Sequence, residues 1–97
     1  MPTYISLVSW TEKGIGAFKD TVDRSEAAQA LAAKLGGSIK SIHWTIGPYD
    51  IVVVSEAPDD ESATAFALEL GAQGNVRTTT MRGFDAGEMR GIIAKTG

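Results

Sequence analysis

The sequence predicts an α+β fold with the element order β-α-β-β-α-β and a short C-terminal helix. An alternating apolar segment opens the chain at Tyr4 to Trp10, and apolar residues then recur at helical spacing as far as the glycine pair Gly36-Gly37. The same strand, helix and strand pattern occurs again in the second half. The chain has 97 residues, a length that suits one domain and not two. We therefore expect a single domain over residues 1–97.

The first strand, Tyr4 to Trp10, carries apolar side chains on both of its faces. Ile5 and Leu7 point to one side, whereas Tyr4, Val8 and Trp10 point to the other. This pattern is typical of a strand that is buried on both sides.

One helix is expected to follow, from a cap at Thr11 to a C-cap signal at Gly36-Gly37, with a bend near Thr21. Gly14 and Gly16 lie in its first turns, where each glycine weakens a helix by up to about 1 kcal/mol relative to alanine. These glycines indicate a frayed helix start, or a place where another segment packs close to the backbone. The apolar positions of this helix are Ile15, Phe18, Val22, Ala27, Ala28, Leu31 and Leu35.

A β-hairpin is predicted next, with strands at Ser38 to Ile46 and Ile51 to Val54. The turn between them is Gly47-Pro48-Tyr49-Asp50, in which Gly47 permits a positive φ and Pro48 fixes its own φ. Strict alternation in the first of these strands puts Ile39, Ser41, His43 and Thr45 on one face and Lys40, Ile42, Trp44 and Ile46 on the other.

The second half continues with a helix, a polar strand and a short terminal helix. Acidic residues at 59–61 mark the start of the helix, which runs to Gly71, and the strand covers Asn75 to Phe84. Asp85 and Glu88 have the spacing of a capping box. The apolar positions of the two helices are Ala63, Phe66, Ala67 and Leu70 in the first and Met89, Ile92 and Ile93 in the second.

This order is the split β-α-β, or ferredoxin-like, arrangement, in which two helices cover one face of a four-stranded antiparallel sheet. The first and third strands are apolar on both faces, so water on the open face would meet a larger apolar patch than monomers usually expose. We therefore expect a homodimer, or a higher homo-oligomer, in which two sheets meet face to face.

The composition excludes several classes of protein. The net charge is -3, the pI is near 5.0 and the nine lysines and arginines are scattered, whereas nucleic-acid binding needs clustered basic residues. The chain has one histidine and no cysteine, which argues against a metal site and fits a reducing compartment. It shows no leader pattern and no run of about 18 apolar residues. We expect a cytoplasmic protein without cofactors that binds neither nucleic acid nor membranes.

The chain resembles the GYD domain family, small bacterial and archaeal proteins named for a Gly-x-Tyr-Asp segment. The resemblance extends over essentially the whole chain and implies a ferredoxin-like fold of the dimeric α/β barrel type, with no known activity and no catalytic residue to transfer. Met81 and Gly83 differ from the Leu and Ala that we would expect there. The segments that carry the resemblance are Trp10-Thr11, His43-Trp44-Thr45, Gly47-Pro48-Tyr49-Asp50 and Gly74-Asn75-Val76-Arg77-Thr78.

His43, Tyr49 and Asp50 are the candidate catalytic residues. His43 is the only side chain whose ordinary pKa lies near neutrality, and a tyrosine hydroxyl beside a carboxylate could polarise a small carbonyl compound. Each also has a structural interpretation: His43 as a half-buried strand residue, Asp50 as an acceptor for turn amides and Tyr49 as a cover for the hairpin.

Trp10, Trp44, Arg77 and Thr79 are the candidate ligand-binding residues. Arg77 and Thr79 share one strand face and could hold a carboxylate or phosphate, and the two indole rings could form an aromatic wall. The alternatives are a charged edge strand for the first pair and core or interface positions for the tryptophans.

Three functions fit these residues. The first is a non-catalytic dimeric domain that binds a small anionic or aromatic ligand, or a protein partner. The second is a cofactor-free oxygenase or isomerase that acts on a small carbonyl or aromatic compound, an interpretation that depends partly on fold analogy. The third is a structural subunit of a larger assembly. The enzyme interpretation requires His43 and Tyr49 to face one cavity.

Overall fold

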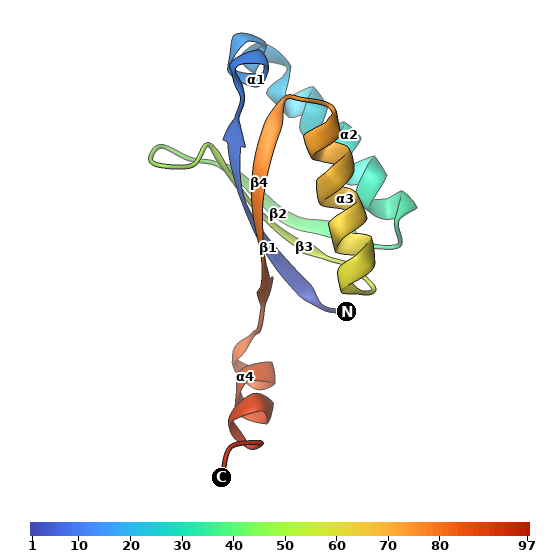
Figure 1. The fold of residues 1–97 in the computed structure, drawn as a ribbon, viewed down its shortest axis with the longest axis vertical. Helices are drawn as coiled ribbons and strands as arrows, with labels where there is room; N and C mark the ends of the chain where they lie inside the picture. The colour runs from blue at the N-terminus through green and yellow to red at the C-terminus, as the bar shows by residue number, and fades with distance from the viewer.

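The computed structural model describes all of residues 1–97 and has the predicted architecture. One four-stranded antiparallel sheet has the strand order β2-β3-β1-β4, and two long helices lie on one side of it (Figure 1). The strands are β1 (Thr3–Trp10), β2 (Ser38–Trp44), β3 (Ile51–Glu56) and β4 (Val76–Gly83). The helices are α1 (Glu12–Gly16), α2 (Thr21–Lys34), α3 (Asp60–Ala72) and α4 (Ala86–Ile93).

The predicted long first helix is three separate pieces. A 3₁₀ turn at Phe18–Asp20 separates α1 from α2, and Ala17 leaves the helical region with φ -108° and ψ 35°. The helix α2 begins at Thr21, where the bend was predicted. Two glycines among the five residues of α1 explain why the helix does not continue.

Gly14 is needed because another segment passes against its backbone. A Cβ atom at Gly14 would lie 1.9 Å from the carbonyl oxygen of Asn75, whereas nothing would lie within 4 Å of a Cβ at Gly16. Thr11 joins the same two segments, because its backbone N–H donates to the Asn75 carbonyl at 3.1 Å and its hydroxyl to the Gly74 carbonyl at 2.6 Å. The prediction of close backbone packing is confirmed at Gly14.

The helix-bearing face of the sheet carries the buried side chains. Val8, Ile51 and Val53 form the centre of the core. Tyr4 and Ser6, on the same side of β1, are also buried. Only 9 of the 97 residues are buried, so the packing of the two helices against the sheet fully excludes water from few side chains.

Strict alternation in the second strand is wrong at one point. The pairing of β2 with β3 shifts between Ile39 and Ser41. Ile39 therefore lies with Ile42 beside the core, and His43 lies on the other face, opposite Val52. A β-bulge adds one residue to a strand and exchanges the faces of the residues that follow it.

The C-terminal helix α4 projects away from the rest of the molecule (Figure 1). The whole chain, α4 included, measures 51 × 30 × 18 Å. The first turn of α4 is the predicted capping box: Asp85 accepts from the Glu88 N–H at 2.7 Å, and Glu88 accepts from the Asp85 N–H at 3.1 Å. Met89 and Ile93 are 45% and 55% exposed. The chain therefore covers only part of the apolar side of α4, where Ile92 is half-buried.

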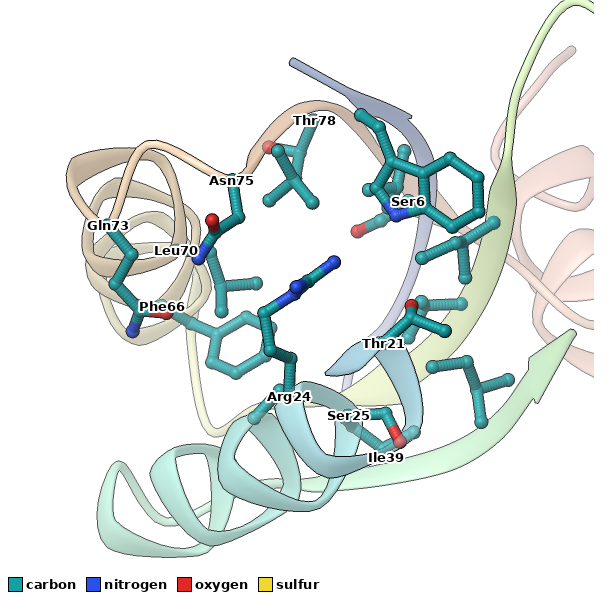
Figure 2. A pocket seen from close by; sticks show the side chains of 17 residues that line it. Ser6, Thr21, Arg24, Ser25, Ile39, Phe66, Leu70, Gln73, Asn75 and Thr78 are labelled. Atoms are coloured by element: carbon teal, nitrogen blue, oxygen red, sulfur yellow. The ribbon is translucent and has the colours of Figure 1, made fainter. Parts of the chain in front are cut away.

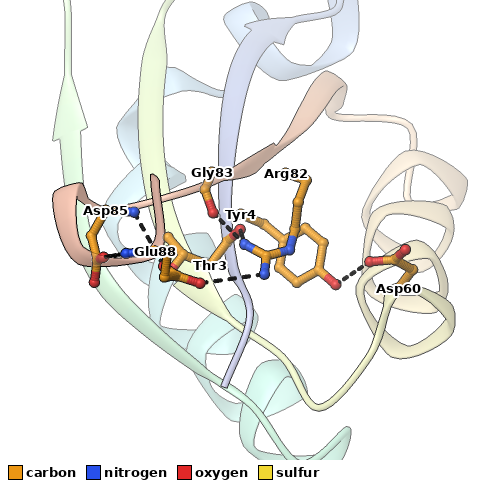
Figure 3. A network of polar contacts seen from close by, with 7 residues as sticks. All are labelled: Thr3, Tyr4, Asp60, Arg82, Gly83, Asp85 and Glu88. Atoms are coloured by element: carbon orange, nitrogen blue, oxygen red, sulfur yellow. Dashed lines mark hydrogen bonds and ion pairs between the residues drawn. The ribbon is translucent and has the colours of Figure 1, made fainter. Parts of the chain in front are cut away.

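A polar network joins β1, α3, β4 and the start of α4 (Figure 3). The Tyr4 hydroxyl donates to Asp60 at 2.5 Å, and Arg82 pairs with Glu88 at 3.6 Å. The hydrogen bond to Asp60, together with burial and the negative charge of that carboxylate, raises the pKa of Tyr4. Because the Arg82 guanidinium also lies 4.5 Å from the centre of the Phe84 ring, it holds the chain where β4 passes into α4.

Candidate binding site

A cavity of about 70 Å³ lies between the sheet and the helices α2 and α3 (Figure 2). Apolar side chains make up most of its wall, including Val8, Ile51, Phe66 and Leu70. Arg24 is the only charged residue that lines it. A mainly apolar pocket with a few polar groups that point inward is the usual form of a small-molecule site.

The Arg24 side chain extends from α2 into the middle of this cavity (Figure 2). Its Nη1 donates to the Ala17 carbonyl at 2.9 Å and its Nη2 to the Gly14 carbonyl at 3.3 Å. These carbonyls belong to the C-terminal part of α1, where a cation is favoured. No carboxylate lies within ion-pairing distance of Arg24. The guanidinium is therefore fixed in place and keeps its charge free for a ligand.

Trp10 contributes its ring to the wall of the same cavity. Its indole Nε1 is buried without a hydrogen-bond partner. Buried donors are nearly always paired, because an unpaired one costs about 1–3 kcal/mol. The Nε1 atom exposes almost no surface, so it is not itself a contact point for a ligand in the cavity.

Asp50 fixes the position of Trp10 through the backbone. The Asp50 carboxylate accepts from the Trp10 backbone N–H at 2.8 Å, while the Asp50 N–H donates to the Val8 carbonyl at 2.9 Å. Asp50 was expected to accept hydrogen bonds from amides of its own turn, and this expectation is wrong. The carboxylate accepts instead from a backbone N–H of the neighbouring strand β1. Gly47 has the positive φ that was predicted for it, at 145°, so the Gly-x-Tyr-Asp segment closes the hairpin and attaches it to β1.

The four predicted ligand-binding residues do not share one site. Trp10 lines the cavity, and Trp44 lies on the same side of the sheet, where its indole N–H donates to the Thr21 hydroxyl at 2.9 Å. Arg77 and Thr79 lie opposite Ser9 and Leu7, on the open face. The sheet separates the two pairs, because a one-residue step along a strand changes the face.

The three predicted catalytic residues are not brought together either. His43 is exposed on the open face, and Tyr49 is half-buried in the hairpin turn. Asp50 is occupied by the Trp10 N–H. None of the three lines the cavity, so this cavity does not provide the geometry that the enzyme interpretation requires. No group of three histidine, aspartate or glutamate side chains could hold a metal ion.

Sequence reasoning missed Arg24. It lies three residues after Thr21 and four before Ala28, and all three line the cavity. This is the spacing of one helix face. A charged residue on the sheet-facing side of a helix was the signal that could have found it.

The open face of the sheet is apolar along its two central strands. β1 contributes Ile5 and Leu7, and β3 contributes Val52 and Val54, which lie directly beside them. The edge strands carry polar residues on this face, with His43 on β2 and Arg77 and Thr79 on β4, and also Met81 of β4 beside Ile5. No helix covers this face (Figure 1).

The sequence matches the model of the GYD domain over residues 4–93. This chain belongs to the GYD domain family. It is 30% identical over 90 residues to the "Glutamine synthetase and cystathionine beta-lyase binding protein" of Thermus thermophilus, and the alignment covers 92% of this chain and 95% of that protein.

The fold is shared with solved structures. FFRP-DM1 superposes with a TM-score of 0.63 at 19% identity over 87% of this chain and 100% of that chain. TTHA0845 from Thermus thermophilus superposes with a TM-score of 0.55 at 24% identity, over 89% and 96% of the two chains. No helix of the GYD chain is both long and apolar enough to cross a membrane.

Proposed function

We propose that this GYD protein is a non-catalytic, cytoplasmic binding protein that acts as a homodimer and binds other proteins. The observation that carries the proposal is the open face of the sheet, where an apolar centre is bordered by polar edge strands. This distribution, with an apolar core and a polar rim, is typical of protein interfaces.

A second copy of the chain is the occupant that fits this face. An isologous dimer places the same residues on both sides of the two-fold axis, so the apolar rows of β1 and β3 meet the same rows of the partner protomer. The dimer also gives α4 a surface on which to pack. This helix, which carries the exposed residues Met89 and Ile93, lies beyond the sheet of its own protomer (Figure 1).

Enzymes are the partner class that the comparison supports. The Thermus thermophilus relative is named for binding glutamine synthetase and cystathionine beta-lyase. We carry this over as part of the proposal: the GYD dimer binds one of these two enzymes. Catalysis by the GYD protein itself is disfavoured by the separation of His43 and Tyr49 from the cavity.

The dimer is tested by sedimentation velocity on the wild type, Leu7→Glu and Leu68→Glu. Leu7 is at the centre of the open face, whereas Leu68 is 68% exposed on α3. We expect Leu7→Glu to be monomeric and Leu68→Glu to remain dimeric, because only the first buries a charge in the interface. Circular dichroism verifies the folding of each variant, and Val52→Thr serves as a milder second variant that weakens the dimer. A monomeric wild type, or equal behaviour of the two leucine variants, would contradict the proposal.

The partner class is tested by calorimetric titration of the wild type into purified glutamine synthetase and, separately, cystathionine beta-lyase from the same organism. Saturable binding to either enzyme supports the proposal. No heat of binding with both, from a protein that is dimeric, would overturn the partner class and leave the dimer standing.

A further inference from the structure

We propose that the cavity between the sheet, α2 and α3 binds a small organic carboxylate with an apolar body, held by the Arg24 guanidinium. The proposal concerns the face of the sheet opposite to the proposed dimer interface. It is therefore independent of the oligomeric state and of any protein partner.

The charge of the cavity indicates an anionic ligand. Arg24 is the single charged group among the lining residues, and no carboxylate of the chain pairs with it. A half-buried cation without a counterion has lost part of its hydration without an ion pair to offset it. An anion inside the cavity restores that balance.

The donors that remain free fit a carboxylate. A guanidinium has five N–H groups, and the bonds to the Ala17 and Gly14 carbonyls use two of them. The remaining N–H groups can bind one or both carboxylate oxygens as a planar fork.

The rest of the wall selects the body of the ligand. Around the Arg24 guanidinium, Figure 2 shows Phe66 and Leu70 from α3 on one side and Ile39 at the base of the sheet. Such a wall suits a short alkyl group. A phosphate dianion fits poorly, because it would meet one positive charge and a largely apolar surface. The volume of about 70 Å³ restricts the ligand to a small acid.

The experiment is a titration followed through the indole N–H signals of ¹⁵N-labelled protein. The chain has two tryptophans, and Trp44→Phe assigns the signal of Trp10. The probes are propanoate and 2-methylpropanoate, each compared with its neutral amide. We expect the acids to move the Trp10 signal in a saturable manner and to bind at least about tenfold more tightly than the amides, because only the acids form a charged fork with Arg24.

Two arginine variants provide the matched comparison. Arg24→Gln should weaken binding of the acid at least about tenfold, whereas Arg77→Gln, on the open face, should leave it unchanged. Arg24→Lys keeps the charge and should bind more tightly than Arg24→Gln. If Arg24→Gln does not fold, the comparison of acid with amide on the wild type decides the matter. A Trp10 signal that neither acid moves, equal effects of acid and amide, or equal loss in both glutamine variants would overturn the proposal.

Discussion

The two faces of the sheet have different covers and carry different chemistry. On the helix side, Ser6 and Val8 lie beneath α2 and α3, and the wall of the cavity contains one fixed cation. On the open side, Ile5 and Leu7 of the same strand lie in an apolar row without a helix above them. The comparison shows how one strand of eight residues can supply both a ligand pocket and an association surface.

The cavity exists because α2 and the sheet meet through small side chains. α2 has five alanines among its 14 residues, and it presents Ser25 and Ala28 to the cavity. On the sheet below, Ser6 occupies a buried position in the wall of the cavity. Small residues on both layers leave space that larger ones would fill. The open face has the opposite composition, with branched residues that need a partner surface.

The largest predicted change in stability follows from detaching the hairpin from β1. Asp50→Ala removes the carboxylate that accepts from the Trp10 N–H, and we expect a loss of about 2 kcal/mol in the free energy of unfolding, since an acceptor that is charged is removed. Asp50→Asn keeps an acceptor oxygen and should lose less. Urea denaturation measures both. Because Trp10 lines the cavity, Asp50→Ala should also weaken binding of small acids. If the alanine variant were as stable as the wild type, the Asp50 carboxylate would not be the group that attaches the turn to β1.

The next prediction concerns the close approach of α1 to the start of β4. Gly14→Ala places a Cβ against the Asn75 carbonyl and should lower the free energy of unfolding by about 1–3 kcal/mol. Gly16→Ala has open space around it and should be neutral or stabilise the protein by up to about 1 kcal/mol, because alanine favours the helix. Thermal unfolding of the two variants makes the comparison. A Gly14→Ala variant as stable as Gly16→Ala would show that the two segments do not pack as described.

Tyr4→Phe is expected to cost about 1 kcal/mol, since it removes the hydrogen bond to Asp60. The Asp60 bond raises the pKa of Tyr4 above its ordinary value, which is about 10. This contribution is therefore complete at pH values below the ordinary pKa and disappears as the pH rises through the pKa of the folded state. Urea denaturation across the alkaline range should show a steeper loss of stability for the wild type than for Tyr4→Phe. The Tyr49 hydroxyl has no hydrogen bond, so Tyr49→Phe is the matched control. Its stability should fall with rising pH as steeply as that of the wild type.

The smallest predicted effect concerns two adjacent threonines of β4 whose side chains lie on opposite faces of the sheet. Thr79→Val adds an apolar side chain to the open face, next to Leu7, and should tighten the dimer a few-fold, by about 0.5–1 kcal/mol. Thr78→Val changes the wall of the cavity instead and should leave the dimer unchanged. Dilution series in sedimentation velocity measure both constants. If Thr78→Val tightened the dimer as much as Thr79→Val, the faces would be assigned wrongly.

Much of the fold could be predicted because its signals are local. Strand periodicity, the turn at Gly47 and the capping box at Asp85 each depend on residues within a few positions of one another, and the structure confirms all three. The resemblance to the GYD family agrees with them. The division of the first helix was predicted only as a bend, because propensity does not decide whether two glycines bend or end a helix.

The site was harder to predict, since it depends on which faces meet. Trp10 and Arg77 were grouped by residue type, but the pairing of β1 with β4 puts their side chains on opposite sides of the sheet. The bulge after Ile39 could not be found from alternation alone. Arg24 gave no signal by itself, because its role depends on the carbonyls of α1, to which it binds.

The most direct test of the proposed dimer is native mass spectrometry of the wild type beside Leu7→Glu. We predict a wild-type mass of about 20 kDa, twice the 10.2 kDa of one chain, and a single chain for Leu7→Glu. A wild type that stays at 10.2 kDa across the concentration range would contradict the assignment of the open face as the association surface.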